Sequence, residues 1–132
     1  MIHHYKSPEA TTSISAKKFF IRFSNLNNLK DFLPKEIKEF KSNEDSCSFK
    51  ISQLPKISLK IIEKTEYSVI KLQSKDKKIF FDLNCKIKED TDKNKCKVTL
   101  GIDIKLNFMT KIMIEKPLNQ FLHKLANQIS KI

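Results

Sequence analysis

The sequence is short of several residue types, and each shortage excludes a class of protein. Its 132 residues include one glycine, no tryptophan and one arginine. A glycine-rich phosphate-binding loop cannot be built from a single glycine. No apolar run approaches the ~20 residues that a membrane-spanning helix needs. The first six residues also lack the apolar centre of a secretory signal peptide. We therefore expect a cytoplasmic protein.

Cysteine is also scarce, which argues against stabilisation by disulfides or zinc. The three cysteines, Cys47, Cys85 and Cys96, are odd in number and share no CxxC spacing. Neither a disulfide framework nor a zinc site is indicated by such a pattern. Each cysteine falls on the apolar side of a predicted strand, so we expect three small buried side chains. We expect no metal and no cofactor.

Positive charge is abundant, but nearly all of it is lysine. The chain has 26 Lys and Arg against 15 Asp and Glu, a net charge of +11, and Arg22 is the only arginine. Proteins that read base sequence usually rely on the planar fork of arginine. The lysines spread along outward strand positions, and the excess of Lys, Ile, Asn and Phe is what an AT-rich coding sequence supplies. We expect no specific nucleic-acid partner. Loose, salt-sensitive attraction to polyanions or anionic membranes through the lysines would follow from charge alone.

The last third of the chain carries the clearest structural pattern. With 39% hydrophobic residues, residues 1–132 can form one domain with a sizeable core. From Cys96 to Leu106 every second residue is apolar, as in a strand with one buried face. From Leu118 onward the apolar spacing becomes helical, and such a stripe can be buried only against the preceding sheet. Pro117 either opens this final helix or interrupts one continuous helix.

The earlier residues predict two short helices and a run of antiparallel strands. Ser15 caps a helix that carries Phe19 and Phe23, and a second helix, capped by Ser24 or Asn25, ends before Pro34. His3 and His4 lie in a tail expected to fray. The polar run 89–95 predicts a hairpin loop, and pairing Lys88 with Lys95 would place Cys85 opposite Val98. Strands are predicted at residues 9–14, 37–42, 46–52, 57–61, 68–74, 81–88 and 96–106.

Three segments of the chain resemble one known family. Residues 25–34 (NLNNLKDFLP), 45–51 (DSCSFKI) and 113–122 (MIEKPLNQFL) are similar to small stand-alone bacterial members of the START-related SRPBCC superfamily. The resemblance implies an α+β helix-grip fold: a strand, two short helices, and a curved six- to seven-strand antiparallel sheet wrapped around a long C-terminal helix. Members bind lipids, sterols, polyketides, hormones or quinones, and the superfamily has no shared catalytic signature.

The same resemblance implies a cavity between the sheet and the last helix. Medium-sized inward residues on the last two strands face apolar residues of the helix, which suits a dry pocket of ~300–1,000 Å³. The same side chains could equally form a filled core. The predicted lining residues are Phe49, Leu59, Leu72, Leu83, Cys85, Val98, Leu100, Ile102, Phe121, Leu122 and Leu125.

The function predicted from these features is non-catalytic binding or carriage of a small hydrophobic ligand, such as a lipid or isoprenoid. The inward faces are almost wholly apolar, so we expect no enzyme. One alternative is a cyclase-like or hydrolase-like enzyme that turns Glu63 or His123 into the cavity. A second alternative is a basic accessory protein that binds RNA or an anionic membrane surface. Tyr5 is isolated in the sequence, and Glu115 is interpreted as part of a local cap or ion pair.

Overall fold

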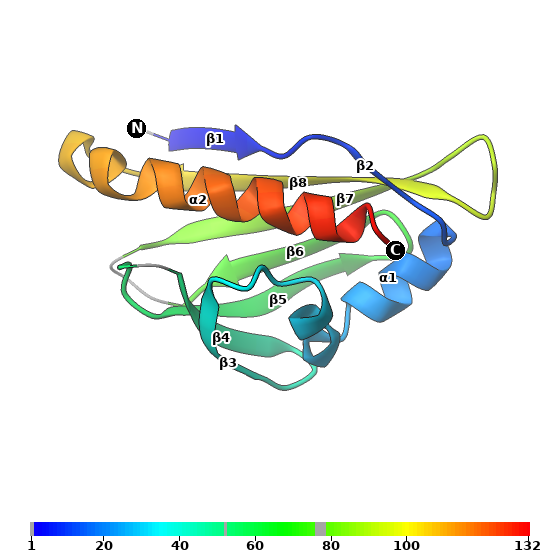
Figure 1. Ribbon diagram of the computed structural model, residues 1–132, viewed down its shortest axis with the longest axis horizontal. Helices are drawn as coiled ribbons and strands as arrows, with labels where there is room; N and C mark the ends of the chain where they lie inside the picture. Colours follow the sequence, from blue (N-terminus) through cyan, green and yellow to red (C-terminus); the bar gives the residue numbers. More distant parts are fainter. Residues whose placement is uncertain (1, 52, 76–78) are drawn as a thin grey trace.

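The computed structural model describes residues 2–51, 53–75 and 79–132, and within them eight strands form one antiparallel sheet (Figure 1). A long C-terminal helix lies across one face of this sheet, so the predicted α+β helix-grip architecture is confirmed. The predicted strand end at residue 52 lies outside the described residues. In chain order the elements are β1 (Ile2–Lys6), β2 (Ala10–Thr12), α1 (Ala16–Phe23), the 3-10 helix η1 (Leu26–Asp31), β3 (Ile37–Ser42), β4 (Ser46–Ile51), β5 (Ile57–Thr65), β6 (Val69–Ser74), β7 (Phe81–Glu89), β8 (Cys96–Lys105) and α2 (Phe108–Ile129).

The strands from β3 to β8 follow one another in space as they do in sequence. The sheet order is β1-β8-β7-β6-β5-β4-β3, and β2 also pairs with β8. Short connections between consecutive strands require this antiparallel pairing. In β8 the apolar positions predicted from the period of two are buried, while the residues between them, such as Thr99 and Asp103, are partly exposed. The buried set faces α2 and builds the core.

Two details of the sheet differ from the prediction. Residues 2–6 do not fray but form β1, which pairs with β8 from Ile2 opposite Lys105 to Lys6 opposite Gly101. The β7–β8 hairpin is also shifted by two residues, because Glu89 pairs with Cys96 and Cys85 lies opposite Leu100. A shift of two keeps every side chain on its original face, so the inward set is unchanged although the partners are not.

Both short helices begin at the capping residues that the sequence indicates. The backbone N–H of Lys18 donates to the side-chain oxygen of Ser15 over 3.2 Å at the start of α1. The N–H of Asn27 donates to the side chain of Asn25 over 3.0 Å at the start of η1. Such caps satisfy amide groups that have no partner within the helix. Helix α1 buries Ala16, Phe19, Phe20 and Phe23.

Helix α2 is continuous from Phe108 to Ile129 and includes Pro117 in its interior. Its first turn is capped by Asn107, whose side chain accepts a hydrogen bond from Thr110 N–H over 2.8 Å. The first buried residue is Ile114, and the buried stripe then runs to Ile129. In Figure 1 the first turns of α2 extend beside the start of β1, at the end of the sheet away from α1. No helix in the described part of the chain is long and apolar enough to cross a bilayer.

The three cysteines are buried and free, as predicted. Burial raises the pKa of the Cys47 thiol to about 12. Burial also raises the pKa of Cys85 and of Cys96, although a hydrogen bond with Thr12 opposes the shift at Cys96. Since the thiolate is the reactive form of cysteine, these residues act as small apolar side chains in the folded protein.

Candidate functional site

The residues predicted to line the internal cavity lie together in the core between the sheet and α2. Every one of them is buried, with no more than 5% of its surface exposed, and all belong to one apolar cluster. Phe49 of β4 and Phe121 of α2 stack with ring centroids 5.6 Å apart, so side chains bridge the space between sheet and helix. Binding of an apolar ligand among these residues stays a prediction.

One groove of about 210 Å³ reaches this core at the seam between α2 and the start of β3. Of the predicted cavity residues, Phe121 is part of its lining. Across the seam, Lys124 Nζ of α2 donates to Glu36 Oε1 over 2.8 Å. This hydrogen bond is the main cause of the lowered pKa of Glu36. The groove is lined by Pro34, Glu36, Ile37, Ile51, Pro117, Gln120, Phe121 and Lys124.

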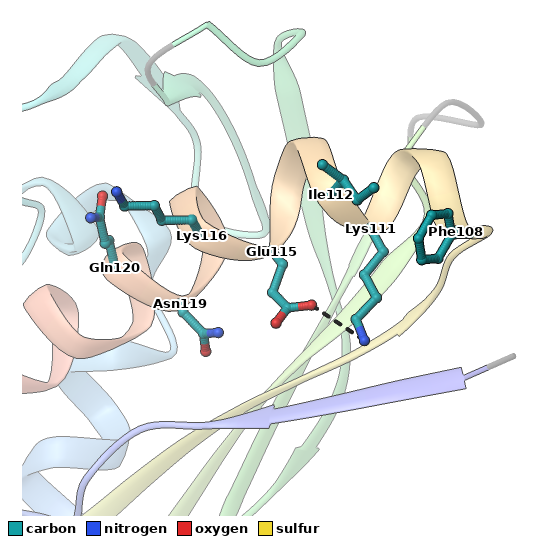
Figure 2. Close-up of a pocket in the computed structure, with 7 residues that line it drawn as sticks. All are labelled: Phe108, Lys111, Ile112, Glu115, Lys116, Asn119 and Gln120. Atoms are coloured by element: carbon teal, nitrogen blue, oxygen red, sulfur yellow. Dashed lines mark ion pairs between the residues drawn. The ribbon is translucent and has the colours of Figure 1, made fainter.

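A larger groove, of about 540 Å³, follows the outer side of α2 (Figure 2). Its lining residues recur three and four positions apart, which places them on adjacent rows of one helix. Figure 2 shows Lys111, Glu115 and Asn119 directed toward the side of the helix where β1 lies. Phe108 and Ile112 make one end of the groove apolar, and amides make the other end polar. The lining consists of Phe108, Lys111, Ile112, Glu115, Lys116, Asn119 and Gln120.

An acid–base cluster forms where this groove meets β1. The hydroxyl of Tyr5 donates to Glu115 Oε2 over 3.0 Å, and Lys111 Nζ lies 3.7 Å from the same oxygen. Partial burial raises the pKa of Tyr5, and its hydrogen bond to Glu115 raises it further. The phenol therefore stays protonated at neutral pH and acts as a donor, while Glu115 acts as an acceptor. The cluster therefore brings a carboxylate, a phenol and an ammonium group into contact beside the groove.

The two residues predicted as possible internal acids or bases are elsewhere. Glu63 on β5 and His123 on α2 are both exposed, so neither enters the space between the sheet and the helix. His4 contacts Asp103, which also accepts a hydrogen bond from Asn84 over 3.0 Å. Within residues 2–51, 53–75 and 79–132, no three His, Cys, Asp or Glu side chains gather in an arrangement that could hold a metal ion.

The Tyr5–Glu115 contact was missed from the sequence, where Glu115 was assigned a purely local role. One part of the cluster had a visible signal, because Lys111 and Glu115 are four residues apart on a predicted helix. Tyr5 had none, since it is 110 positions from Glu115 and lies in a segment expected to fray. Only the pairing of β1 with β8 brings its hydroxyl to the helix.

Comparisons with known proteins identify the fold. No family model matches the chain, and no curated protein matches it. Norcoclaurine synthase from Thalictrum flavum, in complex with dopamine and hydroxybenzaldehyde, superposes with a TM-score of 0.72 at 15% identity, covering 99% of this chain and 86% of the other. A protein from Thermus thermophilus gives 0.71 at 10% identity, with 98% and 95% coverage. An uncharacterised protein from Bacillus thuringiensis gives 0.68 at 13% identity, with 96% and 98% coverage.

The comparison with norcoclaurine synthase corrects one prediction. The apolar inward faces led us to expect a protein that is not an enzyme, but a protein whose fold matches nearly the whole chain is a synthase. The prediction of a non-enzymatic protein is therefore wrong, because an apolar interior does not exclude catalysis in this fold. At these identities the likeness establishes the fold and not the reaction. The chain has a helix-grip fold, shared with norcoclaurine synthase and with the two bacterial proteins.

Proposed function

We propose that this protein is an enzyme that binds a small organic molecule in the groove along α2 and transfers a proton to or from it. The observation that carries the proposal is that Glu115 and Lys111 line this groove in contact with each other, while Tyr5 of β1 donates a hydrogen bond to Glu115. Glu115 is the proton acceptor, and Tyr5 is a neutral hydrogen-bond donor. Lys111 would stabilise negative charge that develops on the substrate.

The groove also indicates what kind of molecule would fit. Phe108 and Ile112 offer an apolar surface at one end, while Asn119 and Gln120 offer amides at the other. A substrate with an aromatic or aliphatic body and a carbonyl or amine group could place the body on the first pair and the polar group near Glu115. The volume of about 540 Å³ is within the ~300–1,000 Å³ usual for small-molecule sites.

The norcoclaurine synthase structure lends support of a general kind. It holds an amine and an aldehyde, dopamine and hydroxybenzaldehyde, in a protein of the same fold. These two compounds are therefore reasonable probes for the present protein.

The proposal is tested by titrating dopamine and hydroxybenzaldehyde into ¹⁵N-labelled protein and following the amide signals of the groove residues. Turnover is measured in parallel as loss of aldehyde absorbance in the presence of the amine. We expect saturable shifts at Lys111, Ile112 and Asn119. We expect Glu115→Gln to lower the rate about 100-fold or more, the usual range for a lost acid–base group. The substituted amide keeps an oxygen that can accept from Tyr5, so the melting temperature should change little.

Glu9→Gln is a matched control for this variant. Glu9 is also a partly exposed carboxylate beside a lysine, with Lys97 Nζ 3.9 Å away, but it does not line the α2 groove. It should leave both the shifts and the rate unchanged. The proposal would be contradicted by an absence of shifts at the groove with both probes, or by equal rates in Glu115→Gln and wild type.

A second candidate function is the binding of an apolar molecule at the seam between α2 and β3. The seam groove already reaches Phe121 and the buried Ile51, and the Glu36–Lys124 ion pair spans it. Lys124→Gln would remove this contact without removing an apolar wall. We expect an apolar dye such as 1-anilinonaphthalene-8-sulfonate to associate faster with this variant than with wild type. Equal association rates, measured by stopped-flow fluorescence, would count against entry at the seam.

A further inference from the structure

Exposed apolar side chains collect at one end of this molecule. Nine large apolar residues are exposed in the described part of the chain, and six of them lie at the end of the sheet where α2 begins. Ile2 is there because it pairs with Lys105, the last residue of β8. Phe80 is there because Phe81, the next residue, pairs with Ile104. The other four are on the first turns of α2, which starts three residues after Lys105.

These four residues, Phe108, Met109, Ile112 and Met113, form what we call the apolar tip. Their exposed fractions run from 65% to 76%, and no residue of α2 before Ile114 is buried. Met109, Ile112 and Met113 follow Phe108 by one, four and five positions, so all four side chains share one face of the helix. An exposed cluster of apolar side chains usually marks a surface that binds another protein or a membrane.

Charges around the apolar tip are mostly positive. Between residues 105 and 120 there are three lysines, Lys105, Lys111 and Lys116, and one acidic residue, Glu115, which is paired with Lys111. The segment therefore has a net charge of +2, in a chain whose net charge is +11. A second copy docked by the same surface would bring the lysines of both copies together, which is unfavourable. An anionic partner with an apolar layer beneath its charges matches both features.

We propose that the apolar tip docks this protein on the surface of an anionic lipid bilayer. Met109 and Met113 insert at the level of the headgroups, while Phe108 and Ile112, which also line the α2 groove, lie at the edge of the contact. Lys105 and Lys116 contact lipid phosphates or carboxylates from either side of the tip. Exposed apolar area and adjacent positive charge together determine the strength of such interfacial binding. The helix lies at the surface and does not cross the bilayer.

The experiment is sedimentation of the full chain with sucrose-loaded vesicles. One set contains phosphatidylcholine alone, and the other contains equal parts of phosphatidylcholine and phosphatidylserine. We expect binding to the anionic vesicles and little to the neutral ones. Met109→Glu combined with Met113→Glu should lower the partition coefficient about tenfold or more, because two carboxylates enter the contact. Lys105→Gln should lower it about fivefold, the effect of about 1 kcal/mol for one lysine near an anionic surface.

Ile21→Glu is the matched control. Ile21 is an isoleucine on a helix with 57% of its surface exposed, close to the 65% of Ile112, but it lies on α1 at the other end of the molecule. This variant should bind vesicles as wild type does. Met109 and Met113 are not among the residues that line the α2 groove, and Glu115→Gln, which removes a negative charge, should not weaken binding to anionic vesicles. Failure of the docking proposal is therefore distinguishable from failure of the proposed enzymatic function.

Three outcomes would overturn the proposal. The first is no sedimentation with anionic vesicles. The second is equal loss of binding in the Met109/Met113 and Ile21 variants, because the loss would then come from the change in the net charge of the protein and not from the apolar tip. The third is a dimer in solution that the Met109/Met113 variant converts to a monomer, which would assign the tip to contact between copies.

Discussion

Replacing Phe49 with alanine measures how tightly the space between the sheet and α2 is filled. Phe49 is fully buried on β4. Its ring centroid lies 5.6 Å from that of Phe121 on α2 and 6.5 Å from that of Phe40 on β3, and both pairs are stacked. It is therefore one of the side chains that connect the far strands of the sheet to the C-terminal helix. If the ring is packed on all sides, its removal leaves a cavity that the surrounding elements cannot close.

The expected cost follows from its burial. Phe→Ala at a fully buried site lowers the free energy of unfolding by about 3–5 kcal/mol, which combines the lost burial with the cavity left behind. At about 2.1 cal/mol/K per residue, the 132 residues give an unfolding entropy of about 0.28 kcal/mol/K. The melting temperature should then fall by roughly 11–18 °C.

Urea titration followed by far-ultraviolet circular dichroism measures the change in free energy, and calorimetry measures the change in melting temperature. Phe80→Ala is the control, because Phe80 is 51% exposed and should change the free energy of unfolding by no more than about 0.5 kcal/mol. A loss below about 1 kcal/mol for Phe49→Ala would refute the reasoning. It would mean that the ring already borders open space, as the prediction of a ligand cavity supposes.

Two further predictions concern ionisable groups. Burial raises the thiol pKa of Cys47, Cys85 and Cys96. Native protein at pH 8 should therefore react with Ellman's reagent only as fast as it unfolds. Rapid reaction of any thiol without urea would contradict this expectation. The hydrogen bond from His4 is the main cause of the lowered pKa of Asp103. A lowered pKa in the folded state adds stability above the unfolded value of 3.8, and this stability is lost as the pH falls through the folded value. Asp103→Asn should therefore reduce the melting temperature at pH 6 but not at pH 2. An equal reduction at both pH values would show that ionisation of Asp103 is not linked to folding stability.

The elements with strong periodicity could be predicted from the sequence. The alternation in β8 and the helical stripe after Leu118 specify both the element type and the buried face. The cap at Ser15 specifies where α1 begins, and for η1 the structure selects Asn25 from the two candidate caps, Ser24 and Asn25. The hairpin register was wrong by two residues because the residues from 89 to 95 are all polar, and no apolar side chain there marks where pairing stops.

The parts that could not be predicted depend on contacts between distant segments. No residue of β1 is fully buried, so its sequence lacks the period-two apolar signal of a strand. Its position is set by the free edge of β8. The role of Glu115 depended on Tyr5 of this strand and was missed for the same reason. The exposed start of α2 was also not predicted, because Met109, Ile112 and Met113 resemble a buried stripe, whereas burial in α2 begins only at Ile114.

The pairing of β1 with β8 has a consequence for the order in which this chain acquires its structure. Strands β3 to β7 are close to their neighbours in the sequence, so they can associate while the remainder is still being translated. Strand β1 must wait for a partner about one hundred positions away, and closing so long a loop is slow. The Tyr5–Glu115 contact joins the two ends of this loop. We therefore expect the Tyr5–Glu115 contact to form after strands β3 to β7 have paired.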